Sequence, residues 1–181
     1  MIYEKNSIQC TQAQIYKDLR KEIDSPMLVV EMIRHVQKYT KGALSACAIK
    51  IKDRKMEDLL SYVSENGMDA IVINQNRQSN YGDFTVFAGI ENRTIYGLDP
   101  QSDGDSPVNI TFTKKLFQKK ATPIPGSVAG DIIIVISDNK NLFTPYARCK
   151  KCRTDVVCVH PGPRIVEFAL CSTCDILWPK K

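Results

Sequence analysis

The sequence predicts an α+β protein that ends in a small cysteine-rich module. Three observations lead to this class. Apolar residues recur at helical spacing in the first part of the chain, strand-like runs with mostly hairpin connections follow, and five of the seven cysteines fall between Cys149 and Cys174. Helices that precede hairpin-linked strands are typical of an α+β fold rather than of a doubly wound sheet. We therefore expect an α+β domain over residues 1–140 and a separate module over residues 141–181.

The expected elements follow from apolar spacing and from residues that start or stop helices. The stripe over 27–41 is the clearest helix, because Ser25 and Pro26 are typical of a helix start and Gly42 of a helix end. Asp53 is placed to cap a later helix. In order, the pattern predicts helices over 11–23, 27–41 and 53–66, strands over 43–51, 70–74, 84–90, 94–98 and 132–137, and a short helix over 113–120.

Composition and charge exclude several classes of protein. The apolar fraction of 43% and the charged fraction of 25% are globular values, which excludes a disordered chain and a collagen. No apolar run approaches the roughly 20 residues of a membrane helix, and the start of the chain is too polar for a signal peptide. We therefore expect a cytoplasmic protein without a membrane partner. In that reducing compartment, clustered cysteines bind metal more often than they form disulfides.

The cysteine cluster has the spacing of a zinc site. Cys149 and Cys152 form one CxxC pair, Cys171 and Cys174 form another, and 18 residues separate the two pairs. Pairs that lie about 15–20 residues apart are a zinc-site pattern. Each CxxC turn aims two thiolates at one point, and four thiolates surround a tetrahedral Zn²⁺ without leaving an open position. We therefore predict one structural zinc in a zinc ribbon over residues 141–181, with hairpin strands between 156 and 170.

Other interpretations of the same segment stay open. The four thiols could form two disulfides or remain unligated, and Cys158 or His160 could replace one of the ligands. Residues 147–181 hold seven basic and three acidic side chains, so a nucleic-acid partner is a further alternative. However, a zinc ion with four thiolates carries a formal charge of about −2. Neighbouring lysines and arginines would offset that charge without any partner.

Cys10 stands directly before the first predicted helix. A thiol at a helix N-terminus has its thiolate stabilised by the helix dipole and by free N–H groups. Papain-like cysteine peptidases present their nucleophile in this way. Such an enzyme also needs a histidine base and a third group that orients the histidine. The alternative for Cys10 is a small buried residue at a helix start.

The order of motifs after Cys10 resembles the bacteriocin-processing, double-glycine-leader branch of the papain-like peptidases. The resemblance covers about residues 7–120. It is carried by a strand of the family's "PVIV" kind at 68–73, a strand similar to "HFVVV-G" at 82–89, a hairpin partner that ends in Asp99-Pro100, and a closing short helix at 113–117. It implies a papain-like fold for the first domain, with Cys10, Asp83 and Asp99 at the positions of the family's catalytic triad.

Asp83 stands where the family has its histidine, and this departure decides the functional prediction. A carboxylate with a pKa near about 4 is a poor base for a thiol with a pKa near about 8.5. Neither His35 nor His160 lies in the family's motif. An approach of His35 to Cys10 would nevertheless favour an enzyme.

Inactive relatives of such peptidases serve as docking domains. The resemblance therefore implies a non-catalytic module that binds a peptide or a partner protein, joined to a structural zinc ribbon. One alternative is an active cysteine hydrolase that uses Cys10. Another is a zinc-ribbon protein that associates with nucleic acid. A cation bound between Asp83 and Asp99 is a further alternative for that pair.

Overall fold

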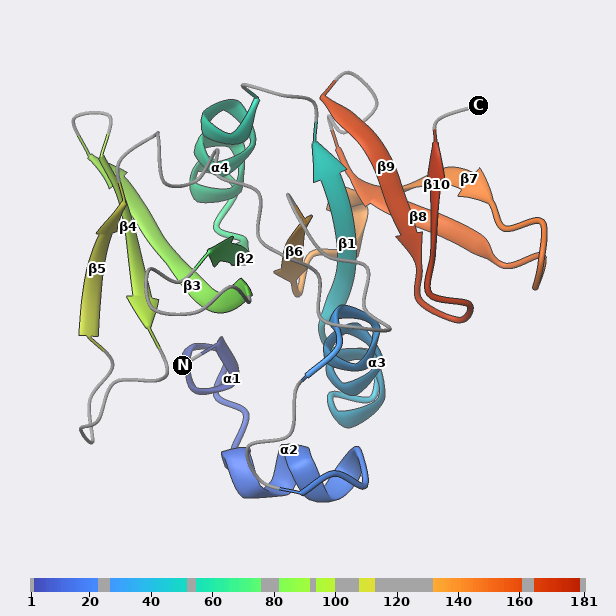
Figure 1. Cartoon of the computed structure of the whole chain (residues 1–181), viewed down its shortest axis with the longest axis horizontal. Coiled ribbons are helices and arrows are strands. Elements are labelled where there is room, and N and C mark those ends of the chain that lie inside the picture. The colour runs from blue at the N-terminus through green and yellow to red at the C-terminus, as the bar shows by residue number, and fades with distance from the viewer. Residues whose placement is uncertain are drawn as a thin grey trace.

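Strand β6 (Ile132–Ser137) lies in the middle of the structure, and all six of its residues are buried. The structure is a computed structural model, and it describes residues 2–22, 27–51, 55–75, 82–91, 94–99, 108–112, 132–160 and 165–179. β6 lies between β1 (Ser45–Ile51) and β2 (Asp69–Gln75) in an eight-stranded sheet with the order β10-β9-β1-β6-β2-β3-β4-β5 (Figure 1). Every ladder among the described residues is antiparallel. The predicted α+β class is confirmed.

The strands predicted before residue 140 all form. The other elements are α1 (Ile2–Lys5), α2 (Gln12–Asp18), α3 (Val29–Tyr39), α4 (Met56–Glu65), β3 (Gly82–Glu91), β4 (Thr94–Asp99), β5 (Val108–Phe112), β7 (Phe143–Arg148), β8 (Asp155–Val159), β9 (Val166–Cys171) and β10 (Ile176–Pro179), with a 3-10 turn at Lys140–Leu142. Strand β5 is an addition to the predicted set. Ser25, Pro26, Asp53 and the short helix predicted over 113–120 lie outside the described residues. No helix that the structure describes has the length and apolar character needed to span a membrane.

Two of the predicted helices are shorter than their apolar patterns. α2 ends at Asp18 rather than at residue 23, because Arg20 adopts a left-handed conformation with φ of 56° that the helix cannot continue through. α3 begins at Val29, where the Glu31 carboxylate accepts a 2.8 Å hydrogen bond from the backbone N–H of Leu28. α3 ends at Tyr39 rather than at residue 41, because Lys41 and Gly42 are both left-handed, with φ of 50° and 79°, and the Gly42 N–H satisfies a helix carbonyl.

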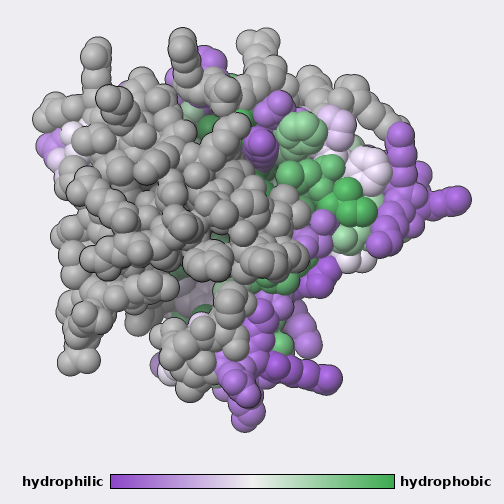
Figure 2. Space-filling view, viewed as in Figure 1, coloured by the Kyte–Doolittle hydropathy of each residue, from purple (hydrophilic) through white to green (hydrophobic). Residues whose placement is uncertain are grey.

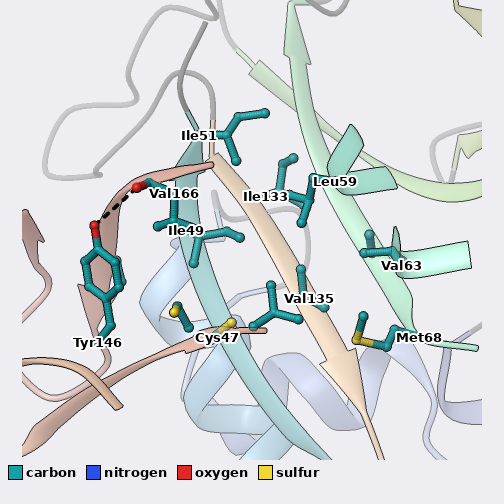
Figure 3. Close-up of a cluster of buried hydrophobic side chains, with 14 of the residues drawn as sticks. Cys47, Ile49, Ile51, Leu59, Val63, Met68, Ile133, Val135, Tyr146 and Val166 are labelled. Atoms are coloured by element: carbon teal, nitrogen blue, oxygen red, sulfur yellow. Dashed lines mark hydrogen bonds between the residues drawn. The ribbon is translucent and has the colours of Figure 1, made fainter. Parts of the chain in front are cut away.

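The sheet separates two apolar clusters, since successive strand residues face opposite sides. On one face, Ile132, Ile134 and Ile136 of β6 pack with the buried side of α3. On the other face, Ile133 and Val135 pack with α4 and with the β7–β8 pair, as Figure 3 shows around Cys47 and Tyr146. The Tyr146 hydroxyl donates hydrogen bonds to the carbonyls of Val166 (3.3 Å) and Glu167 (3.0 Å). These bonds hold the β7–β8 pair against the sheet.

Part of the cysteine-rich segment belongs to the main sheet, and β7 and β8 form a separate two-stranded sheet. β9 pairs with β1, from Ile49 opposite Ala169 to Ile51 opposite Val166, and β10 pairs with β9. The expectation that the strands between 156 and 170 form one hairpin is wrong, because β8 pairs with β7 and β9 pairs with β10 and β1. Apolar side chains gather over β9 and β10, beside hydrophilic side chains at the β7–β8 end (Figure 2). The division at residue 140 stays a prediction.

Candidate metal centre and candidate binding cavity

The two CxxC pairs occupy the turns of two hairpins. Cys149 and Cys152 lie between β7 and β8, whereas Cys171 is the last residue of β9 and Cys174 lies between β9 and β10. In each turn the residue after the second cysteine is left-handed, with φ of 62° at Arg153 and 55° at Asp175. In each turn that residue also donates its backbone N–H to the carbonyl of the first cysteine, at 2.8 and 2.9 Å. The two turns, which we call the first and second knuckle, therefore share one backbone geometry.

The sulfurs of the two knuckles meet at one point. All four ligand atoms lie within 4.8 Å of one another, and the Cys152 and Cys171 sulfurs are 3.6 Å apart. A tetrahedral zinc with Zn–S distances of about 2.3 Å requires sulfurs about 3.8 Å apart. Four soft thiolates also select zinc rather than magnesium or calcium, which prefer oxygen ligands. The four cysteines are therefore placed to hold a metal ion, and their geometry and chemistry fit the predicted zinc.

The surroundings of the first knuckle lower the pKa values of its two thiols, Cys149 and Cys152, and so favour their thiolate forms. Burial raises the pKa of the Cys149 thiol, but backbone N–H groups of Cys152 and Lys151 outweigh it and leave that pKa below its ordinary value. The Thr154 hydroxyl is the main reason why the pKa of Cys152 falls to about 6. The hydrogen bond to Cys152, and then burial, raise the pKa of Cys174 to about 12. A divalent cation bound among these four sulfurs would displace the remaining thiol protons and leave four thiolates.

The alternative ligands Cys158 and His160 lie outside the cluster of four sulfurs. Cys158 lies in β8 and is buried, His160 is exposed, and neither belongs to the group of four sulfurs. All seven cysteines are described, and none is in a disulfide. The basic side chains around the first knuckle are exposed: Arg148, Lys150, Lys151 and Arg153. A nucleic-acid partner for them stays a prediction.

An apolar cavity lies on the face of the sheet that α3 covers. It has a volume of about 500 Å³, within the size range of ligand-binding pockets. Ile134 and Ile136 of β6 form its floor, Met32 and Val36 of α3 form one wall, and Phe84 of β3 lines it as well. Cys10 and Thr11 line the same cavity. The sequence pattern gave no sign of this cavity, because its walls come from separate elements.

Cys10 borders the cavity, and the pKa of its thiol is raised. It precedes Thr11, the N-cap of α2, whose hydroxyl accepts a 3.2 Å bond from the backbone N–H of Gln14. Burial raises the pKa of Cys10, a hydrogen bond from Tyr39 lowers it, and Asp18 raises it; the pKa stays above its ordinary value. The expected stabilisation of a thiolate by the helix start is therefore wrong. α2 has only seven residues, and burial is the largest cause of the raised pKa of Cys10.

His35 approaches this region, and both of its ring nitrogens are engaged. Nδ1 lies 2.7 Å from the Tyr3 hydroxyl, and Nε2 lies 3.3 Å from a carboxylate oxygen of Asp18. The ring stacks on Tyr39 at a centroid distance of 5.1 Å, and its side chain is 5% exposed. His35 and Cys10 line one cavity. Each ring nitrogen of His35 therefore has a hydrogen-bond partner other than Cys10.

The positions that match the family's acidic pair lie on neighbouring strands. Asp83 is the second residue of β3 and Asp99 is the last residue of β4. Val86 of β3 is opposite Leu98 of β4, which places both positions toward the same end of that strand pair. Phe84, next to Asp83, lines the cavity with Cys10. The assignment of Cys10, Asp83 and Asp99 as a triad stays a prediction, as does a cation between the two aspartates.

Several residues at the cavity were missed by sequence reasoning. Tyr3, Asp18 and Tyr39 surround His35, but they are 32, 17 and 4 positions away from it in the chain. Only Tyr39 could have been found, because residues four apart share one face of a helix.

Comparison with protein-family models and with curated proteins finds no match to the chain. The resemblance to bacteriocin-processing peptidases therefore stays a prediction.

Proposed function

We propose that this chain is a non-catalytic binding module that receives an apolar side chain of a peptide or partner protein in the cavity between α3 and the sheet. The observation that carries this proposal is the cavity itself, about 500 Å³ in volume and lined mostly by apolar side chains. A peptide that buries one large apolar side chain there would gain roughly 1.5–3 kcal/mol from that side chain alone. A structural zinc at the four cysteines would stabilise the scaffold.

The polar groups at the cavity support binding over catalysis. Burial is the main cause of a raised pKa at the Tyr3 hydroxyl and also raises the pKa of Cys10, so both groups are neutral at pH 7. His35 is held by Tyr3 and Asp18. A cysteine hydrolase needs a thiolate and a base within reach of it. These residues instead offer hydroxyl, thiol and imidazole groups at the edge of an apolar site, which is the usual composition of a specificity pocket.

The test is a selection of displayed random peptides on the full zinc-loaded chain. Enriched peptides are expected to carry a large apolar residue, and Val36→Phe should weaken their binding by about 10–100-fold, because the new ring fills the site. Val36 is 6% exposed and lines the cavity. Ser64→Phe is the matched control, since it adds the same ring to an exposed position of α4. Peptides that bind Val36→Phe and the wild type equally would contradict the proposal.

The reactivity of Cys10 separates the binding module from a hydrolase. Because its pKa is raised, the thiolate should be scarce at pH 7 and should appear only as the pH rises past the ordinary thiol value of about 8.5. Alkylation by iodoacetamide, mapped to the peptide that contains Cys10, should follow that rise. Rapid alkylation that is already complete below pH 7 would support the hydrolase instead.

A further inference from the structure

Arg34 of α3 forms hydrogen bonds with the second knuckle of the candidate metal centre. Its guanidinium donates from Nε to the carbonyl of Ser172 and from Nη2 to the carbonyl of Thr173, the latter at 2.6 Å. These are the two residues between Cys171 and Cys174. A guanidinium fork that meets two neighbouring acceptors fixes orientation as well as distance. The metal centre and α3 are therefore joined by a specific polar contact.

The helix that carries Arg34 is also a wall of the cavity. Met32, His35 and Val36 line the cavity, and Ile33 packs into the apolar cluster on that face. Arg34 stands between these residues in sequence and reaches the knuckle on another side of the helix. A small displacement of this half of α3 would therefore change the shape of the cavity.

A second set of contacts extends from this half of α3 to α2. The Glu31 carboxylate caps α3 at Leu28 and forms a 2.7 Å ion pair with Lys21, which follows α2. This pair is partly sheltered, with side-chain exposures of 19% for Lys21 and 21% for Glu31. Because Ile15 and Tyr16 of α2 also line the cavity, two walls of the cavity are linked to the Arg34 contact.

We propose that metal binding at the four cysteines sets the shape of the cavity through Arg34. With the metal bound, four sulfurs hold the second knuckle and present its two carbonyls to Arg34. When the metal leaves, the turn between Cys171 and Cys174 loses its tether, and the carbonyls no longer hold a fixed position. The start of α3 and the end of α2 then lose one of their anchors. The metal would thus regulate the proposed binding site, and the coupling acts in both directions, because a ligand that favours the ordered walls also favours the bound metal.

Hydrogen exchange on the full chain tests this coupling without any cavity ligand. Removing zinc from the wild type with a chelator should speed amide exchange in residues 12–22 and 27–36 by about five- to hundredfold. Arg34→Gln with zinc bound should show much of the same increase, and chelation should add little to it. Arg34→Lys should lie between the two, since an ammonium group cannot reproduce the fork. Native mass spectrometry confirms beforehand that each variant carries its zinc.

Arg148→Gln is the matched control, because Arg148 donates a 3.0 Å bond from Nε to the Arg153 carbonyl in the first knuckle, away from α3. It should leave exchange in both segments as in the wild type. Equal exchange in Arg34→Gln and Arg148→Gln, or segments that do not respond to chelation in the wild type, would overturn the proposal. The inference rests on the proposed function only in treating the cavity as a binding site. A failed peptide selection and an absent exchange response are therefore distinct results.

Discussion

Replacing Cys171 by serine is expected to remove the metal and to cost the protein about 4 kcal/mol or more of its free energy of unfolding. Cys171 is 1% exposed, and it ends β9, which pairs with β1 in the middle of the sheet. A hydroxyl is a much poorer zinc ligand than a thiolate, and three sulfurs would leave the two knuckles without a common anchor. Native mass spectrometry should find one zinc on the wild type and none on Cys171→Ser. Thermal unfolding should show the loss of stability.

Cys158→Ala is the informative control for this experiment. Cys158 is fully buried in β8 and was an alternative ligand on sequence grounds, so its replacement also disturbs packing. It should lower stability by about 1 kcal/mol, as a small truncation in a core does, and should keep the zinc. A Cys158→Ala variant that loses its zinc while Cys171→Ser retains it would show that the ligand set differs from the four grouped sulfurs.

The parts of the fold that the sequence predicts are those with local signals. The run at β6 is short, apolar and β-branched, which favours a buried strand. Gly42 marks the end of α3, because its left-handed conformation is typical of a residue that follows a helix. The grouping of the four cysteines is predictable for the same reason. Two residues fit between the cysteines of each pair, and the backbone of that short turn decides where their sulfurs point.

The pairing of β9 with β1 could not be predicted in the same way. Ile49 and Ala169 are opposite each other in the sheet but 120 positions apart in the chain. A CxxC pair indicates a tight turn, and it contains nothing about which strand the hairpin will join. The expectation of one hairpin over 156–170 followed from treating the segment as self-contained. In the structure β9 and β10 extend the main sheet, where their side chains reach both clusters, whereas β8 forms a separate two-stranded sheet with β7.

The His35 contacts show why the cavity also escaped prediction. His35 is a buried residue of α3, and a buried histidine is more often a core residue than a functional one. Its partners Tyr3 and Asp18 come from two other helices, and no spacing rule connects them. The family resemblance directed attention to Asp83 instead. The site forms only when α1 and α2 pack against α3. The sequence pattern of a single segment does not predict that packing.

Ile133 and Ile134 provide the sharpest stability test of the cavity. They are neighbours on β6, both are 0% exposed, and they face opposite sides of the sheet. Ile133 packs among α4 and the β7–β8 pair, whereas Ile134 lines the cavity. Truncating a buried isoleucine to alanine costs about 2–5 kcal/mol, and the cost depends on how many packing contacts are lost. Ile133→Ala should therefore cost about 4 kcal/mol and Ile134→Ala about 2 kcal/mol.

Urea unfolding of both zinc-loaded variants measures this difference, provided that the denaturant slope stays the same. The comparison is internal, because the two changes remove the same atoms from adjacent positions of one strand and act on the same unfolded chain. The apolar cavity beside Ile134 leaves its side chain with fewer packing partners to lose. If Ile134→Ala costs as much as Ile133→Ala, the space beside Ile134 is filled by packed side chains in solution. The proposed binding site would then have no room for a ligand, whatever the metal centre does.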